Sequence, residues 1–157
     1  MRILHVTKKY PNALGGDATG SSSLEREQIK NANEVFILTT NSEEIINKEN
    51  IIKFGLKSNY QDWDAISFKR LLSTIGFLIK SKRYIKKIKP DIIHSHSAEL
   101  GYILSFVCRK YNIPIINQCR GVSFPYPERT TFLRRVVEKF CLKHGKFDKI
   151  ITVDENS

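Results

Sequence analysis

The sequence lacks a long apolar run and has few cysteines. No uninterrupted apolar segment approaches the roughly 18 residues that a membrane-spanning helix needs, and the apolar start at Arg2–Val6 is too short for the centre of a signal peptide. The cysteines, Cys108, Cys119 and Cys141, are widely spaced and form no C-x-x-C pair, which argues against a zinc or redox motif. We therefore expect reduced, mostly buried thiols and a cytoplasmic protein.

Acidic residues are also scarce. The 157 residues include 16 aspartates and glutamates against 26 lysines and arginines, so the formal net charge is +10. A basic surface attracts phosphate-rich partners, whether nucleic acid, anionic lipid or a diphosphate substrate, and charge alone does not distinguish them. The chain of 18.1 kDa is 41% hydrophobic, which is enough for one globular core.

Short β-branched runs alternate with helical patterns along the chain. The expected strands are residues 2–7, 34–40, 51–54, 91–95, 113–117 and 149–153. The expected helices are residues 22–31, 65–89, 98–111 and 128–144. This alternation predicts an α/β fold with a Rossmann-like, doubly wound parallel sheet of about six strands flanked by helices.

The helix expected at residues 65–89 has the clearest periodicity. Its apolar stripe comprises Phe68, Leu71, Leu72, Ile75, Leu78, Ile79, Ile85 and Ile88, and its basic face comprises Lys69, Arg70, Lys80, Lys82, Arg83, Lys86 and Lys87. A crossover helix with a solvated basic face is the simplest interpretation. A second and compatible interpretation is that this face holds the protein against an anionic membrane surface, where each basic residue contributes up to about 1 kcal/mol.

A loop with three glycines follows the first expected strand, at residues 8–20, and contains Gly15, Gly16 and Asp17. Glycines let the backbone approach a ligand closely, and the amino terminus of the next helix offers unpaired N–H groups to an anion such as a diphosphate. The spacing matches neither G-x-G-x-x-G nor the Walker pattern, so no dinucleotide or ATP site is predicted. A plain turn is the competing interpretation.

The strand expected at residues 91–95 leads into two histidines, His94 and His96. Polar residues just past the carboxyl end of a buried parallel strand face the crevice where ligands bind, so we favour His96 for a functional role. For His94 we prefer the interpretation as a core histidine that ends the strand with a satisfied hydrogen bond. We expect the two side chains to point to opposite faces, and no third ligand follows at a metal-binding spacing, so no metal site is predicted. His5, in the first strand, gives no functional signal.

Several segments taken together resemble the amino-terminal domain of family 4 (group 1) glycosyltransferases of the GT-B fold. They are Met1–Val6, Gly15–Gly16, Asn33–Thr40, Pro90–His96, Pro114–Gly121 and Phe147–Glu155. The resemblance implies a retaining transferase of the hexosyltransferase type that moves a sugar from a nucleotide-diphosphate donor to a glycan or lipid-linked acceptor. It implies no cofactor and no obligatory metal. It also implies that residues 1–157 are the acceptor-side domain, and that a carboxyl-terminal donor-binding domain is absent from this chain.

The resemblance assigns roles to particular residues. Gly15 and Gly16, followed by Asp17, match a glycine loop whose backbone amides meet the donor diphosphate or the acceptor. His96 matches the second histidine of the family's His-x-His strand end, near the acceptor and the reaction centre. We therefore take His96 as a catalytic candidate, and the loop residues as donor- or acceptor-binding candidates.

The sequence departs from the family pattern at the end of the fifth expected strand. The family often has a histidine before a glycine there, and this chain has Arg120 before Gly121. We take Arg120 as a second catalytic candidate and Gly121 as a donor- or acceptor-binding candidate. Because arginine stays charged and presents a fork of donors, we predict that Arg120 binds a leaving diphosphate or an anionic acceptor group and does not shuttle a proton. Glu99 could orient an acceptor hydroxyl, but we prefer a role at the start of the next helix.

A second class of function is a non-catalytic basic Rossmann-like module that binds nucleic acid or anionic lipid. A nucleic-acid reader of this size is expected to have a basic recognition helix or an aromatic strand motif, and neither is found. We therefore predict a transferase without a nucleic-acid partner, with the helix at 65–89 as the candidate contact to the inner membrane face. A bilobal site needs both walls to orient its reactants, so residues 1–157 alone are predicted to be inactive.

Overall fold

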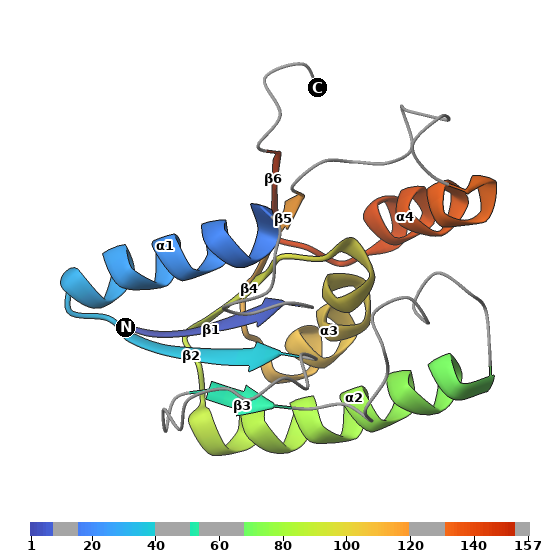
Figure 1. Ribbon diagram of the computed structural model, residues 1–157. Coiled ribbons are helices and arrows are strands. Elements are labelled where there is room, and N and C mark those ends of the chain that lie inside the picture. Colours follow the sequence, from blue (N-terminus) through green and yellow to red (C-terminus); the bar gives the residue numbers. More distant parts are fainter. Residues whose placement is uncertain (8–15, 40–50, 54–67, 120–130, 153–157) are drawn as a thin grey trace.

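The computed structural model describes residues 1–7, 16–39, 51–53, 68–119 and 131–152. These residues form a six-stranded parallel sheet in the order β3-β2-β1-β4-β5-β6, flanked by helices (Figure 1). The strands are β1 (Arg2–Thr7), β2 (Glu34–Thr39), β3 (Ile51–Lys53), β4 (Ile92–Ser95), β5 (Ile115–Cys119) and β6 (Lys149–Thr152). The helices are α1 (Gly16–Lys30), α2 (Phe68–Ile88), α3 (Ala98–Tyr111) and α4 (Phe132–His144). The predicted doubly wound parallel sheet is confirmed.

The strand order reverses between β1 and β4. From β1 the chain proceeds to β2 and β3 on one side, and then returns to place β4, β5 and β6 on the other side. In open parallel sheets, ligands bind beyond the carboxyl ends of the strands at such a reversal. In the β1–β4 register, His5 lies opposite His94. The order of the strands therefore brings these two histidines to the same part of the sheet.

The two faces of the sheet have different surroundings. One face carries the main core, in which Leu4 and Val6 of β1 pack with α2 and α3. The buried members of this core are Leu4, Val6, Leu38, Phe77, Ile85, Ile88, Ile93, Leu100, Leu104, Cys108 and Ile115. Helix α1 lies across the other face (Figure 1), where Gln28 reaches the side chain of His5. Helix α4 packs against α3.

The structure corrects the predicted apolar stripe of α2. Phe77, Ile85 and Ile88 point into the core, but Ile75 and Ile79 are exposed. The buried positions of α2 share one narrow face at spacings of three and four residues, and Ile75 and Ile79 fall outside it. The side chains of Phe68, Leu71 and Leu72 lie outside the described residues. Helix α2 therefore presents two isoleucines on the outer surface together with basic residues of its second half.

Helix α3 has the predicted bounds, and its carboxyl end carries a clear signal. The helix ends at Tyr111, and the left-handed backbone of the following Asn112 (φ 53°) lets its N–H bond the carbonyl of Arg109. The N–H of Ile113 then donates to Cys108 O at 3.0 Å, and Pro114 has no N–H. Strand β5 accordingly begins at Ile115, two residues later than predicted.

The starts of α1 and α4 also differ from prediction. Helix α1 begins at Gly16 and not at residue 22, so Gly16 and Asp17 belong to its first turn and not to the predicted loop. The first residues of α1 are small and have low helix propensity, and Ser21, one turn further on, is fully buried. Helix α4 begins at Phe132 because Thr131 is extended and its side chain accepts from the N–H of Arg134.

Helix α3 lies close to the sheet at Gly101. A Cβ atom at this position would lie 2.3 Å from Asn117 Oδ1 and 2.9 Å from Ser95 Oγ, and both residues are fully buried. We expect Gly101→Ala to lower the free energy of unfolding by about 1–3 kcal/mol, measured by chemical denaturation. Gly76→Ala in α2 is the matched control, because nothing lies within 4 Å of its Cβ position. Gly76→Ala should raise the free energy of unfolding by about 0.5–1 kcal/mol. If both variants changed the free energy of unfolding in the same direction, the packing described would be contradicted.

Candidate functional site

The chain makes a tight turn between β4 and α3 at the carboxyl edge of the sheet. Ser95 Oγ donates to Ser97 O at 2.9 Å and accepts from the Ser97 N–H at 3.4 Å. Between them, the His96 N–H donates to Val6 O at 2.8 Å, which fixes the backbone of His96 to the end of β1. His96 is 5% exposed. It is thus held rigidly at the point where the strand order reverses.

The predicted site residues fall into two groups. His96 and Glu99 lie together at the carboxyl edge, and Glu99 is in the first turn of α3, where a negative charge suits the helix dipole. Gly16 and Asp17 are in the first turn of α1. Gly15, Arg120 and Gly121 lie outside the described residues, so the predicted convergence of Arg120 with His96 stays a prediction.

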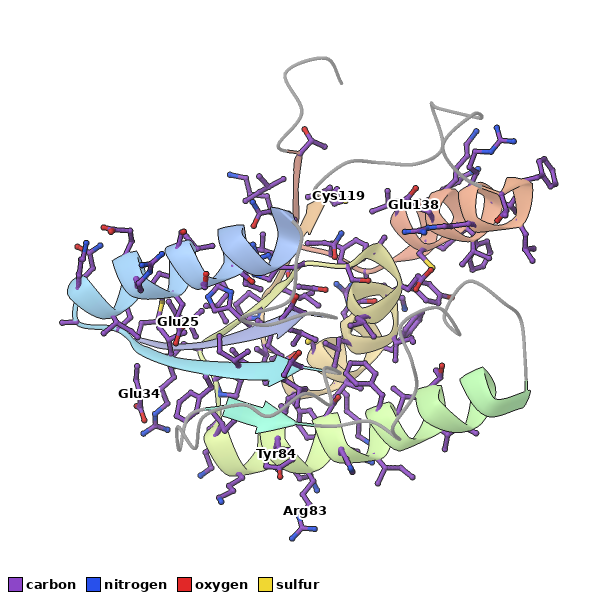
Figure 2. The ribbon with its side chains drawn as sticks, in the orientation of Figure 1. Glu25, Glu34, Arg83, Tyr84, Cys119 and Glu138 are labelled. Atoms are coloured by element: carbon purple, nitrogen blue, oxygen red, sulfur yellow. The ribbon has the colours of Figure 1, made fainter. Side chains whose placement is uncertain are left out.

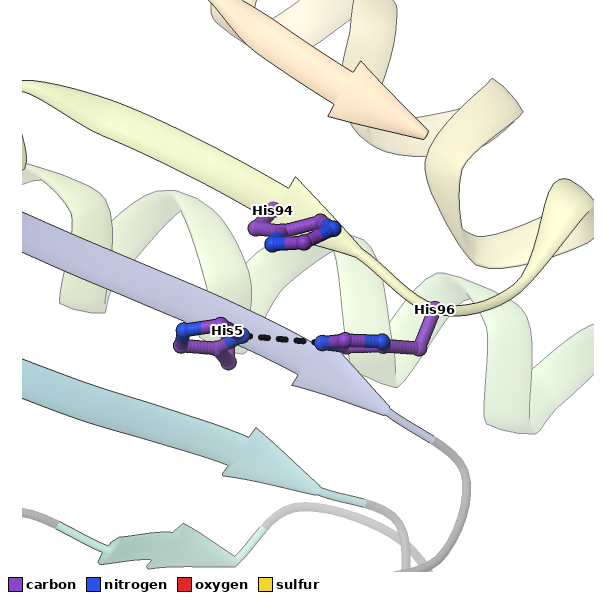
Figure 3. Close-up of side chains that lie close together, drawn as sticks. All are labelled: His5, His94 and His96. Carbon is purple, nitrogen blue, oxygen red and sulfur yellow. Dashed lines mark hydrogen bonds between the residues drawn. The ribbon is translucent and has the colours of Figure 1, made fainter. Parts of the chain in front are cut away.

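Three histidine rings meet on the α1 face of the sheet, as Figure 3 shows for His5, His94 and His96. His5 Nδ1 lies 2.8 Å from His96 Nε2, which is a hydrogen bond between the two rings. The ring of His94 stacks on that of His96, with centroids 4.5 Å apart and an interplanar angle of 26°. Its centroid is 5.1 Å from that of His5. We call these three residues the histidine cluster.

The histidine cluster corrects two sequence-based interpretations. His94 and His96 were expected on opposite faces, but their rings lie side by side because residues two apart on an extended chain share a face. His5 was given no role, yet it contacts His96 directly. The signal that could have found it is the sheet register, since adjacent parallel strands β1 and β4 place His5 opposite His94.

Gln28 of α1 completes the contacts of His5. Its Oε1 lies 2.6 Å from His5 Nε2, on the side of the ring away from His96. Burial lowers the pKa of His5 below its ordinary value of 6.5, and the Gln28 hydrogen bond opposes this only in part. Neutral His5 is therefore the form that the fold favours.

The lowered pKa of His5 makes stability depend on pH. The lowered pKa of buried His5 adds to the free energy of unfolding. This contribution is complete above pH 6.5, the ordinary pKa, and is lost as pH falls through the lower pKa of the folded state. We expect the urea concentration at the midpoint of unfolding to be lower at about pH 5.5 than at about pH 7.5, two values on either side of the ordinary histidine pKa. His5→Gln should reduce this fall, and His144→Ala, at an exposed position of α4, should not. Equal slopes in all three proteins would contradict a neutral buried His5.

The histidine cluster is also the group among the described residues that could ligate a metal ion, since candidate ligand atoms from its three members lie within 4.8 Å of one another. Nitrogens sharing a tetrahedral zinc ion lie about 3.4 Å apart, given Zn–N distances near 2.1 Å. The 2.8 Å hydrogen bond between His5 and His96 would have to open before the two rings could share an ion. The geometry therefore fits a hydrogen-bonded network better than a metal centre.

All three cysteines are free and buried, as predicted. Burial, with a smaller contribution from Asp148, raises the pKa of Cys108 to about 12. Burial also raises the pKa of Cys119, at the end of β5, and the carboxylate of Glu138 on α4 adds to the effect (Figure 2). Cys108 and Cys119 therefore stay protonated thiols at neutral pH, and neither is suited to nucleophilic chemistry.

Two surface hollows lie at the opposite, amino edge of the sheet. One is lined by Ile85, Lys86, Lys89, Pro90, Asp91, Tyr111, Asn112 and Ile113, and the other lies beside it around Arg109, Pro114, Lys146 and Asp148. Neither reaches the histidine cluster. Because parallel α/β sheets bind ligands beyond the carboxyl ends of their strands, we retain the edge that carries His96 as the candidate site.

Comparison with known proteins identifies the family. Glycosyltransferase Family 4 matches residues 14–157. The chain belongs to this family. Over 129 residues it is 28% identical to an α-monoglucosyldiacylglycerol synthase of Streptococcus pneumoniae, a match that covers 74% of this chain and 26% of that protein. The chain thus spans about a quarter of the length of this relative.

Solved structures agree on the fold. Sucrose-phosphate synthase from Thermosynechococcus elongatus superposes with a TM-score of 0.66 at 16% identity, covering 92% of this chain and 41% of that one. MurG from Acinetobacter baumannii gives 0.58 at 14% identity, with 99% and 41% covered. A UDP-GlcNAc 2-epimerase from Methanocaldococcus jannaschii gives 0.61 at 15% identity, with 99% and 40% covered. The family 4 chain therefore has the Rossmann-like architecture of one GT-B half.

Among the described residues of the family 4 chain, no helix combines the length and apolar character needed to span a bilayer.

Proposed function

We propose that this family 4 chain is the amino-terminal, acceptor-side half of a retaining glycosyltransferase that uses a nucleotide-diphosphate sugar. The family match over residues 14–157 carries the proposal. The position of His96 supports it, since the residue is pinned at the carboxyl edge where the strand order reverses. A UDP-GlcNAc 2-epimerase has the same fold, so the fold alone does not distinguish a glycosyltransferase from an epimerase.

We propose a lipid or lipid-linked glycan as the acceptor. The S. pneumoniae relative is named for a glucosylated diacylglycerol, which is a membrane lipid. Helix α2 supports the idea, because Ile75 and Ile79 are exposed on its outer surface. The basic residues Lys80, Lys82, Arg83, Lys86 and Lys87 are exposed as well, and Arg83 projects away from the sheet (Figure 2). Apolar tips among basic side chains suit peripheral contact with an anionic inner membrane face.

The proposed roles follow the chemistry of each side chain. His96 meets the acceptor near the reaction centre, and Arg120 stabilises negative charge on the leaving diphosphate. The Gly15, Gly16 and Asp17 segment approaches the diphosphate or the acceptor through backbone amides. Glu99 supports the start of α3. The reaction is proposed to need no resident metal ion.

The test of this function is a transfer assay on the complete protein. It is incubated with a panel of nucleotide sugars and with vesicles containing diacylglycerol and anionic lipid, and release of the nucleoside diphosphate is measured. We expect one donor to support release that depends on the acceptor vesicle and persists in EDTA. Release of nucleotide without a glycosylated product, or no release with any donor, would overturn the proposal. Loss of activity in EDTA would overturn metal independence.

The isolated residues 1–157 provide a second arm of the assay. We expect weak nucleotide-sugar binding and no turnover, because both walls of a bilobal site are needed to orient the reactants. Robust transfer by this chain alone would contradict its assignment as one half of the site.

A further inference from the structure

We infer that the outer surface of α3 and α4 binds an anionic lipid bilayer, with exposed apolar side chains of α4 entering the lipid interface and lysines beside them meeting lipid phosphates. The inference rests on the lipid acceptor proposed above, and it adds a second membrane contact to the one proposed for α2. It follows from where basic and exposed apolar side chains gather on the two faces of the sheet.

The basic residues of the chain are concentrated on one side of the sheet. Helices α2 and α3 cover the main core, and α4 packs against α3. These three helices contain thirteen lysines and arginines against two glutamates, Glu99 and Glu138. Helix α1, on the other face, contains two basic residues against three acidic ones. The excess positive charge of the chain therefore lies in the three-helix layer, which attracts an anionic partner.

Helix α4 leaves most of its apolar side uncovered. Its one buried residue is Cys141. At about 100° per residue, Phe132 and Val136 lie on the side of the helix away from Cys141, and Phe140 lies next to them. These three side chains and Leu133 are between 44% and 73% exposed. An amphipathic helix buries such a row when a partner is available, so the row marks a contact surface.

Aromatic side chains of α3 continue this surface. The rings of Tyr102 and Phe140 meet edge to face with centroids 5.7 Å apart, and those of Tyr102 and Phe106 do so at 5.1 Å. Phe106 is exposed as well, and Lys146 Nζ lies 5.4 Å from the centre of its ring. We call this connected set of side chains the apolar surface: Tyr102, Phe106, Phe132, Leu133, Val136 and Phe140.

Lysines stand beside the apolar row of α4. Lys139 follows Phe132 by seven residues, and Lys143 follows Val136 by the same number, so each projects from nearly the same side of the helix as its partner. Both lysines are exposed. A helix that lies in a membrane interface has this arrangement, with apolar side chains entering the lipid and basic side chains reaching the headgroups.

A bilayer fits the apolar surface better than a nucleic acid does. Nucleic-acid phosphates pair with lysines, and bases stack on aromatic rings, but Leu133 and Val136 offer nothing to a base. Exposed aliphatic side chains among basic ones suit a lipid interface. Helix α2 packs against α3 as α4 does, and its exposed Ile75 and Ile79 belong to the same layer (Figure 1). We therefore assign the contacts of α2 and α4 to one bilayer, with α1 on the side facing water.

Vesicle flotation of the complete protein tests the apolar surface without any sugar transfer. The wild type should bind vesicles of phosphatidylcholine with about one third phosphatidylglycerol. Phe132→Ala/Phe140→Ala should lower the apparent affinity at least about tenfold, since two rings no longer enter the interface. Phe132→Ala alone, at the most exposed position of α4, should lower it in the same direction with an unchanged thermal midpoint. Ile29→Ala on α1 is the matched control, because Ile29 is exposed to a similar extent as Phe140, and it should bind as the wild type does.

The charge contribution is tested by a second pair of variants. Lys139→Glu/Lys143→Glu should lower the affinity for the anionic vesicles about tenfold or more. Arg26→Glu/Lys30→Glu makes the same change at the same spacing on exposed positions of α1, and should bind as the wild type does. Equal binding to vesicles of phosphatidylcholine alone would overturn the inference, as would wild-type binding by the α4 variants. Tighter binding to a DNA duplex than to anionic vesicles would assign the surface to nucleic acid and would also overturn it.

The flotation result and the transfer assay fail separately. If transfer to diacylglycerol is found while the α4 variants keep vesicle binding, the inference fails and the proposed function stands. If no nucleotide sugar supports transfer while the α4 variants lose vesicle binding, the proposed function fails and the membrane surface on α3 and α4 stands.

Discussion

Replacing Phe77 with alanine is expected to lower the free energy of unfolding by about 3–5 kcal/mol. Phe77 is 1% exposed and belongs to the core that joins α2 and α3 to the sheet through residues such as Leu4 and Leu104. Truncation removes the apolar burial of the ring and leaves a cavity that rigid strands cannot fill. Urea denaturation of the wild type and the variant measures the difference.

Phe132→Ala is the control for this substitution. It makes the same change on α4, where the ring is 73% exposed, and should alter stability by no more than about 0.5 kcal/mol. Similar losses for the two variants would mean that the core does not lie between α2 and the sheet as described.

The second large effect concerns the sugar transfer that we propose for the complete protein. His96→Ala is expected to lower kcat/KM by at least about 100-fold, the scale on which a residue positioned for acid–base or hydrogen-bond catalysis contributes. His96 is held at the end of β4 by its own N–H and by the hydrogen bond from its ring to His5. The measurement is nucleoside diphosphate release at several acceptor concentrations.

His144→Ala is the matched histidine variant, because His144 lies in the last turn of α4 and is exposed. It should retain the wild-type rate. A His96→Ala protein that keeps its thermal unfolding midpoint and transfers sugar at the wild-type rate would remove His96 from the reaction.

Local signals were sufficient for much of the fold. The bounds of β1 and α3 match the prediction because apolar runs end at clear stop signals, such as Asn112 after α3. Strand β5 is displaced by two residues because Ile113 completes the end of α3, so its place depends on the preceding helix. Helix α1 starts earlier than predicted, although its first residues have low helix propensity, so propensity did not indicate its start.

The histidine cluster could be predicted only in part. His96 was found because it follows a buried strand, and this is a local pattern. Its contact with His5 joins residues 91 positions apart, and that contact depends on β1 and β4 being neighbours in register. The contact with Gln28 also depends on how α1 is oriented about its axis on the sheet. Neither the strand register nor this orientation can be derived from the periodicity of one segment.

Hydrogen exchange of the complete protein, with and without its nucleotide sugar and acceptor, tests the location of the site most directly. We predict slower exchange where β4 passes into α3, at residues 95–100, when both substrates are present. The amino edge, at residues 109–114, should be unchanged. Protection confined to residues 109–114, with none at residues 95–100, would contradict a sugar-transfer site at the carboxyl edge of this sheet.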